Sequence, residues 1–304
     1  MCLTQNLVWL RQAAQRPCKG EGAALNKVVS DQADGLRYLM AQHSGMQAAH
    51  VIALVGSSPR IGVTSVALNL AAALVQQGKE VLLLDEQSGS RSATAMCAGA
   101  AAGSWSDVAA GGMSLPLAAS RMACGALLLP VYRNDLAAAA TAVRSVFQGQ
   151  VILIDARLDE SGALSPLAAQ ADDVIVVLRP QAASITAAYT CIKQLHYAHA
   201  LQRLRIMVNQ AAGMPEAQRV LNNLAATGSR YLGLALESAG CVAADPYLAR
   251  AQGLKLSVVE AFQTSAAAVD FRRIAGQLLQ WPRNVETAVE TAGAATAAAT
   301  ARAH

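Results

Sequence analysis

The sequence contains no uninterrupted apolar run of about 18 residues, the length that a membrane-spanning helix needs, so we expect no transmembrane helix. Residues 1–10 carry neither an early positive charge nor a long apolar core, which argues against a secretory signal. The six cysteines show no CxxC spacing. In a chain of 304 residues without a signal, they indicate reduced thiols and a cytoplasmic location.

Charge and aromatic content are also low. The net charge is +4, and part of it lies near the N-terminus, in Arg11, Arg16, Lys19 and Lys27. Aromatic residues make up 4% of the chain, and none is interleaved with a basic patch of the kind that binds single strands. We therefore expect no direct nucleic-acid partner.

What is present is enough apolar material for a large core, since 54% of the residues are hydrophobic, many of them alanine. Strand-like runs alternate with helical stretches, which predicts an α/β protein with a doubly wound, mainly parallel sheet. The expected strands are residues 51–55, 81–84, 126–130, 151–154, 174–178, 205–208 and 232–236. We expect loop and weak helix over 88–112 and a helix over 269–279 that packs onto the sheet through Val269, Phe271, Ile274, Leu278 and Leu279.

Three regions are expected along the chain. Residues 1–50 form an N-terminal extension with a short helix over 31–40, and residues 51–283 form the α/β domain. Residues 284–304 are rich in Ala and Thr and read as a low-complexity tail.

The first strand leads into a turn of small residues, after which Gly62, Thr64 and Ser65 open a helix. This is the context of a phosphate-binding loop, in which backbone N–H groups and the helix N-terminus point at phosphates and a Thr hydroxyl helps to hold Mg²⁺. The lysine of such a loop is missing, because Val63 occupies its position.

The runs LLLDEQ (82–87) and VILIDAR (151–157) resemble the two acid-tipped strands of the MinD/ParA group of P-loop ATPases, whose loop has the form KGGxGKT. Alignment on Gly62 and Thr64 places Ser58 and Val63 at the two lysines, and Pro59 and Arg60 at the two glycines. The resemblance implies an ATP and Mg²⁺ site in a MinD/ParA-like fold. Its cofactor-binding residues would be Arg60, Gly62, Val63, Thr64, Ser65, Asp85, Asp155 and Asn209, with Thr64 and Asp155 at the metal.

The acids carry specific roles in that resemblance. Asp155 matches the carboxylate that holds Mg²⁺, and Asp85 begins a pair whose second acid orients the attacking water, although Gln87 stands there. Asn209 matches the asparagine that reads adenine. The alternatives are a helix cap or turn for Asp155, an Asx turn for Asn209, and for Arg60 a solvated loop residue instead of a substitute cation.

The missing lysines weaken the predicted enzyme. One cation in phosphoryl transfer is worth about 10³-fold, or roughly 4 kcal/mol, so hydrolysis is expected to be negligible. The backbone loop, Thr64 and Asp155 could still hold a Mg²⁺ nucleotide weakly. The lysine that reaches across a dimer in the family is replaced by Ser58, so ATP-driven dimerisation is in doubt.

Further segments resemble the FlhG, or FleN, type of flagellar number regulator within this group. The stretch 174–195 is similar to that family's PExTSITDAYxxIK segment through Pro180, Ser184, Ile185, Thr186, Ala188, Tyr189, Ile192 and Lys193. The stretch 229–262 is similar to the family's end region, in which an aspartate and a tyrosine-bearing helix lie near the adenine. The segment DQADGLRYLM (31–40) resembles the short helix with which FlhG proteins engage the GTPase FlhF.

The resemblance therefore implies control of flagellar number and placement through an FlhF-type GTPase, which this helix would contact through Asp31, Gln32, Ala33, Leu36, Arg37 and Leu39. It also allows a flagellar transcriptional activator or basal-body partner, a homodimer, and peripheral contact with the inner membrane.

Four alternatives remain open. The helix over 31–40 could pack on its own domain, the chain could be an active ATPase switch, or it could be a ParA relative that positions another cargo. A short-chain dehydrogenase is disfavoured, because the NNAG-like stretch follows the YxxxK pair of Tyr189 and Lys193 instead of preceding it. His196 and His199 share a helix face but have no third ligand, so we expect no metal there.

Overall fold

The computed structural model describes residues 49–97, 99–132, 143–147 and 149–282. The predicted helix over 31–40 and the tail over 284–304 lie outside these residues. An eight-stranded sheet with the order β3-β4-β2-β5-β1-β6-β7-β8 forms the centre of the domain. The strands are β1 (His50–Gly56), β2 (Val81–Asp85), β3 (Ser120–Arg121), β4 (Leu127–Pro130), β5 (Val151–Asp155), β6 (Asp173–Leu178), β7 (Arg203–Ala211) and β8 (Ala235–Ala243).

Every pairing in this sheet is parallel except that of β3 with β4. The connecting helices are α2 (Val63–Gln76), α3 (Ala93–Met96), α4 (Trp105–Ala109), α5 (Leu115–Ala118), α6 (Val143–Val146), α7 (Ala182–His199), α8 (Met214–Leu232), α9 (Tyr247–Gly253), α10 (Val258–Ala261) and α11 (Ala266–Leu278). Two short 3-10 turns, η1 (Gly89–Arg91) and η3 (Ala168–Gln170), complete the connections. This architecture confirms the predicted doubly wound, mainly parallel α/β fold.

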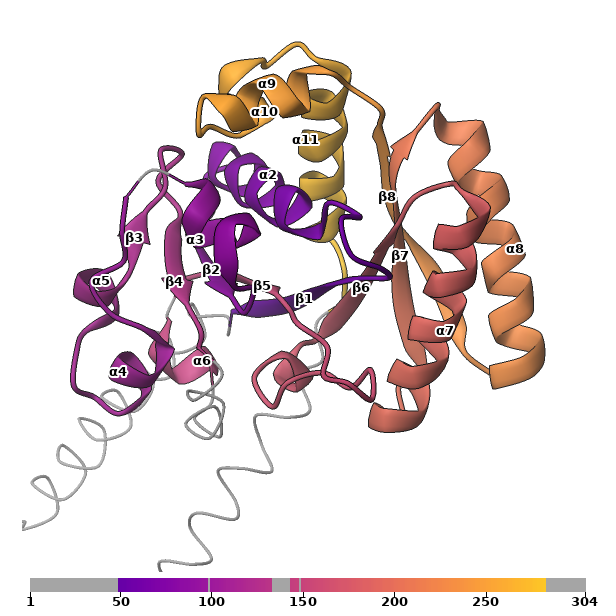
Figure 1. Cartoon of the computed structure of the whole chain (residues 1–304), viewed down its shortest axis with the longest axis horizontal. Coiled ribbons are helices and arrows are strands. Elements are labelled where there is room, and N and C mark those ends of the chain that lie inside the picture. Colours follow the sequence, from indigo (N-terminus) through magenta and orange to yellow (C-terminus); the bar gives the residue numbers. More distant parts are fainter. Residues whose placement is uncertain (1–48, 98, 133–142, 148, 283–304) are drawn as a thin grey trace, which may run out of the picture. The chain divides into compact units, whose positions relative to one another are not determined.

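Alternate residues of each central strand supply two cores, one on each face of the sheet. In β1, Val51, Ala53 and Val55 pack with α4 to α8, whereas Ile52 and Leu54 pack with α2 and α9 to α11. Because both faces are covered, the central strands are apolar throughout, as expected for parallel sheets. Figure 1 shows α2, α9, α10 and α11 grouped on one side of the sheet, and α7 and α8 beside β7 and β8.

Helix α11 packs against α2 and β8. A glycine in β8 permits this close approach, because a Cβ at Gly240, whose φ is 124°, would lie 2.6 Å from Ile274. Phe271, Ile274 and Leu278 are buried, which confirms the predicted packing of this helix, but Val269 is 49% exposed and does not belong to its inner face.

One predicted strand is wrong. Of residues 232–236, only the last two belong to a strand, because Leu232 ends α8, Gly233 caps it with φ 62°, and β8 begins only at Ala235. Leu232, Leu234 and Leu236 alternate with other residues as in a strand. This alternation spans the end of α8 and the start of β8, and it therefore predicted a strand that begins too early. In the described residues, no helix is long and apolar enough to cross a membrane.

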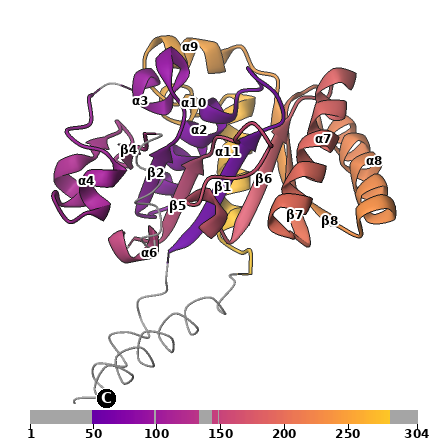
Figure 2. The same cartoon turned by 60° about the horizontal axis from the view of Figure 1, so that its bottom comes forward.

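The edge of the sheet at which β1, β6 and β7 begin holds a buried ion-pair network. Asp173 accepts hydrogen bonds from Arg205 Nε at 2.8 Å and pairs with His50 Nε2 at 2.9 Å. Arg205 also pairs with Glu237 at 2.7 Å, and its guanidinium lies 3.7 Å from the centre of the Trp281 ring. Figure 2 shows that the described chain enters β1 and leaves α11 on this same side of the domain.

Candidate functional site

The loop between β1 and α2 has the backbone of a phosphate cradle. Gly62 adopts φ 94°, and a Cβ at this position would lie 2.7 Å from Asn209 Nδ2. No side chain caps α2. Among the described residues, the N–H groups of Gly62, Val63 and Thr64 donate no hydrogen bond, so the helix N-terminus offers unsatisfied donors to an anion.

Side chains from two other strands hold this loop in place. Asn209, at the end of β7, donates from Nδ2 to the carbonyl of Ile61 at 3.0 Å. Arg179, just after β6, donates from Nη2 to the carbonyl of Arg60 at 3.0 Å. Arg60 itself has φ 65°, a left-handed conformation that favours glycine and that matches its place at a glycine of the family loop.

Asp155 lies at the end of β5, fully buried and in register with Asp85 of β2. Burial raises the pKa of Asp155 to about 7; the hydroxyl of Thr64 and the amide of Gln87 oppose this rise, while the charges of Asp85 and Glu86 add to it. Its Oδ2 atom has no hydrogen-bond partner within the described part of the chain. A buried carboxylate oxygen left free beside a threonine hydroxyl is the kind of donor set that Mg²⁺ takes.

Asp85 is occupied by local contacts. Its Oδ2 accepts hydrogen bonds from the N–H and the hydroxyl of Thr94, both at 2.7 Å, and its Oδ1 accepts one from Gln87 N at 3.1 Å. The carboxylate therefore fixes the start of α3 and the turn after β2, so that its direct contact with a cofactor stays a prediction.

Gln87 stands over the end of β5. Its Nε2 donates to the carbonyl of Ala156 at 2.9 Å and approaches Asp155 Oδ1 at 3.4 Å. A carboxylate at this position could make neither contact and would add a second negative charge beside Asp155. The neutral amide is thus matched to the buried acid, but it cannot act as a base.

A cleft of about 810 Å³ opens in front of the loop. It is lined by residues 56–65 and by Gln87, Ser88, Arg91, Met96, Ala156, Arg157, Leu158, Asp159 and Gln252. A smaller pocket of about 190 Å³ adjoins Gly62 and includes Asn209, Arg179, Leu248 and Gln252. The structure therefore brings Arg60, Gly62, Val63, Thr64 and Ser65 to the cleft, places Asn209 at the side pocket, and sets the buried Asp155 beneath Thr64.

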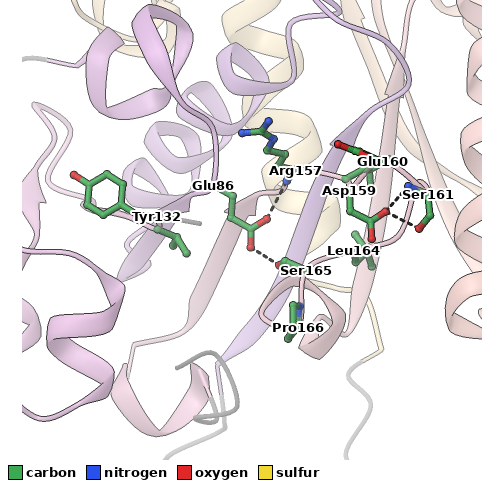
Figure 3. Close-up of a pocket in the computed structure, with 11 residues that line it drawn as sticks. Glu86, Tyr132, Arg157, Asp159, Glu160, Ser161, Leu164, Ser165 and Pro166 are labelled. Carbon is green, nitrogen blue, oxygen red and sulfur yellow. Dashed lines mark hydrogen bonds between the residues drawn. The ribbon is translucent and has the colours of Figure 1, made fainter. Parts of the chain in front are cut away.

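A second cleft of about 580 Å³ lies beside the first and includes Glu86, Tyr132, Leu164 and Pro166 (Figure 3). Glu86 accepts hydrogen bonds from Ser165 Oγ at 2.5 Å and from Arg157 N at 2.9 Å. Burial raises the pKa of Glu86 in spite of these bonds. Both carboxylate oxygens are engaged, so this acid supports the walls between the two clefts.

Three arginines at the site were not predicted. Arg91, Arg157 and Arg179 come from connections after β2, β5 and β6, outside the loop motif. The sequence offered one indication that Arg157 and Arg179 belong to the site. Arg157 comes two residues after Asp155 and Arg179 comes directly after β6, and the carboxyl ends of parallel strands meet at one edge of the sheet.

Comparison with solved structures shows which class of proteins shares this fold. No family model matches the chain. The MinD cell division protein of Aquifex aeolicus has a TM-score of 0.62 at 20% identity, covering 78% of this chain and 100% of MinD. MinD of Pyrococcus horikoshii, complexed with Mg-ADP, has a TM-score of 0.58 at 16% identity, covering 76% of this chain and 96% of that one. The fold is that of the MinD/ParA-type P-loop NTPases.

A sequence relative narrows the class. The chain is 27% identical over 256 residues to the antiactivator FleN of Pseudomonas aeruginosa, a match that covers 80% of this chain and 91% of FleN. The resemblance to the FlhG and FleN type that the sequence predicted is confirmed.

Proposed function

We propose that this protein is a FleN-type regulator of flagellar number and placement that acts by binding protein partners and has a weakened nucleotide switch. The observation that carries the proposal is the similarity to antiactivator FleN over 91% of that protein's length. The name antiactivator supports an activator as one class of partner, which we expect to be a flagellar transcriptional activator. An FlhF-type GTPase is the other, because of the motif over 31–40.

The residues present fit a Mg²⁺ nucleotide. The phosphates would lie at the unsatisfied N–H groups of Gly62 to Thr64, and the Thr64 hydroxyl and Asp155 Oδ2 would hold the metal, whose charge would offset that of the phosphates. The charge of a bound Mg²⁺ would lower the raised pKa of Asp155 and so keep its carboxylate ionised. The complex of the Pyrococcus horikoshii MinD with Mg-ADP supports this assignment.

The base would occupy the side pocket. Asn209 Oδ1 is buried without a partner in the described residues, whereas Nδ2 is held by the loop. A free amide oxygen next to a pocket of about 190 Å³ suits an exocyclic amine such as that of adenine.

By contrast, the cations and the acid that ATP hydrolysis needs are missing. Val63 and Ser58 provide no cation, and the amide of Gln87 is spent on Ala156 O. We propose that nucleotide is bound and turned over very slowly, and that ATP-driven homodimerisation is weakened because Ser58 cannot reach across a dimer as a lysine would.

Partner docking is assigned to residues 31–40. Leu36, Leu39 and Met40 share one side of the expected helix, and Asp31 stands at its N-terminus as a cap. An isolated helix of this length is marginal, so it is expected to order on its partner. Cytoplasmic location with peripheral contact at the inner membrane is part of the same proposal.

Co-purification tests the docking. The full chain and an FlhF-type GTPase should co-purify, the Leu36→Asp/Leu39→Asp variant should lose the GTPase, and a control, Ser44→Asp, placed just outside the motif, should keep it. If both variants captured the GTPase equally well, the helix would not be the docking site, and the alternative in which it packs on its own domain would be favoured. Absence of capture by the wild type would favour a ParA relative for another cargo.

A further inference from the structure

Three arginine side chains line the 810 Å³ cleft, although the loop has lost its lysines. Arg60 belongs to the loop, Arg91 ends η1, and Arg157 follows β5. No ion pair within the described residues includes any of them. Three cations without a carboxylate partner therefore face one cavity.

The walls of the cleft carry little opposing charge. Asp159 is the one acidic residue among those lining it. Its Oδ1 accepts hydrogen bonds from the N–H and hydroxyl of Ser161 and from Ala163 N, at 2.7 to 2.9 Å, so it is engaged in its own turn. The cleft consequently has an excess of positive charge beside the unsatisfied N–H groups of α2.

Two of the arginines are placed together. Arg157 Nη1 donates to Ser88 Oγ at 3.3 Å, which ties the connection after β5 to the segment just before η1, where Arg91 lies. Figure 3 shows the Arg157 guanidinium pointing away from the Glu86 carboxylate. Arg91 is exposed and forms no ion pair within the described residues, so its guanidinium is available to a ligand.

We propose that Arg91 and Arg157 supply from outside the loop the positive charge that binds the phosphates of a nucleoside polyphosphate in this chain. This inference rests on the proposed nucleotide site and names its cation donors. Guanidinium groups suit the task, because each presents a planar fork that binds phosphate oxygens through two hydrogen bonds and stays charged at all relevant pH values.

The surrounding residues agree with such a rearrangement. Val63, at the lysine position, is apolar and partly buried, and it packs against the core beneath α2. Gln87, which also lines the cleft, is a neutral amide at a position where the family has an acid. Fewer negative groups need fewer cations, so two arginines at the cleft wall suffice to hold an anion that the loop alone would bind weakly.

The test is calorimetric titration of the full chain with Mg-ATP and, separately, with inorganic tripolyphosphate. The Arg91→Gln/Arg157→Gln variant should bind both ligands about tenfold to a hundredfold more weakly. The matched control Arg219→Gln, an exposed arginine on α8 away from the cleft, should bind within about twofold of the wild type. Addition of Val63→Lys to the double variant should restore binding, because it returns a loop cation.

Unchanged affinity in the double variant, or no binding of either ligand by the wild type, would overturn the proposal. If the double variant fails to fold, Arg91→Lys/Arg157→Lys keeps the charges without the forks. It should bind both ligands more weakly than the wild type, and unchanged affinity would overturn the guanidinium contacts on which the proposal rests. Co-purification of the double variant with the FlhF-type GTPase should be unaffected, so failure here is separate from failure of the proposed function.

Discussion

The buried network around Asp173 makes the sharpest stability prediction. The Asp173 side chain is 1% exposed and is held by Arg205 Nε at 2.8 Å and His50 Nε2 at 2.9 Å, with Arg203 at 3.4 Å. The substitution Asp173→Asn removes the acid but leaves the Arg205 side chain 5% exposed. Breaking a buried pair in this way costs about 3–5 kcal/mol, since an uncompensated charge stays in the core.

The lower end of that range is expected, about 3 kcal/mol, because Arg205 keeps Glu237 at 2.7 Å and the face of Trp281. Urea unfolding followed by circular dichroism measures the loss. The control is Glu237→Gln, which removes an acid from the same arginine but at a side chain that is 44% exposed, and it should cost no more than about 1 kcal/mol. Similar losses for the two variants would refute the reasoning that burial decides the magnitude.

The same residue gives a pH dependence. Burial alone would raise the pKa of Asp173, but hydrogen bonds from His50 and Arg205 outweigh it and hold the pKa below its ordinary value. A lowered folded-state pKa gives stability that is present above the unfolded pKa of about 4 and is lost as the pH falls through the folded pKa. The difference between the wild type and Asp173→Asn should therefore shrink in acid below about pH 4.

Three further predictions concern the site. Ser58→Lys/Val63→Lys should tighten Mg-ATP binding by about tenfold or more, measured by calorimetry, while phosphate release stays slow because Gln87 is neutral; fast release would restore the active ATPase reading. Asp155→Asn should stabilise the nucleotide-free protein by about 4 kcal/mol at pH 8 and by little at pH 4, since a folded-state pKa raised to about 7 costs stability as the pH rises from about 4 to 7; equal thermal melting shifts at both pH values would contradict the pKa. Arg60→Gly should raise the unfolding free energy by up to about 1 kcal/mol by relieving φ 65° and leave Mg-ATP affinity within about twofold, whereas a tenfold loss would move the cation role to the loop.

The sequence predicted most of the fold because parallel strands covered on both faces are apolar runs separated by helices, as at residues 51–55 and 151–154. It failed at residues 232–236, where leucines alternate across the end of a helix and only the left-handed Gly233 marks the boundary. Val269 was misplaced for a related reason, because an apolar residue one position off the buried face of α11 reads as part of it. Local pattern thus determines which elements form, and burial by distant elements determines their limits.

At the site, motif spacing and the family resemblance pointed to the loop glycine, Thr64, Asp155 and Asn209, but nothing in the sequence indicated that Asn209 and Arg179 hold the loop. Arg179 and Asn209 reach the loop carbonyls from positions 119 and 148 residues away in the sequence. Arg91 and Arg157 share a cleft only because β2 and β5 are neighbours in the sheet. Such convergence depends on strand order, which a single sequence does not encode in any local pattern.

The loop lacks two lysines, and the acidic ends of the neighbouring strands also differ from those of a typical phosphate-binding site. At the ends of β2 and β5, Asp85 accepts hydrogen bonds from Thr94, Gln87 is a neutral amide, and burial raises the pKa of Asp155 to about 7. The cradle nevertheless remains, with Gly62 in its left-handed conformation and the loop carbonyls held by Arg179 and Asn209. Within the described residues, the N–H groups of Gly62 to Thr64 donate no hydrogen bond, and Arg60, Arg91 and Arg157 have no ion-pair partner, so these groups remain available to an anion. The arrangement therefore agrees with the proposed site, which would bind phosphate without the groups for rapid cleavage.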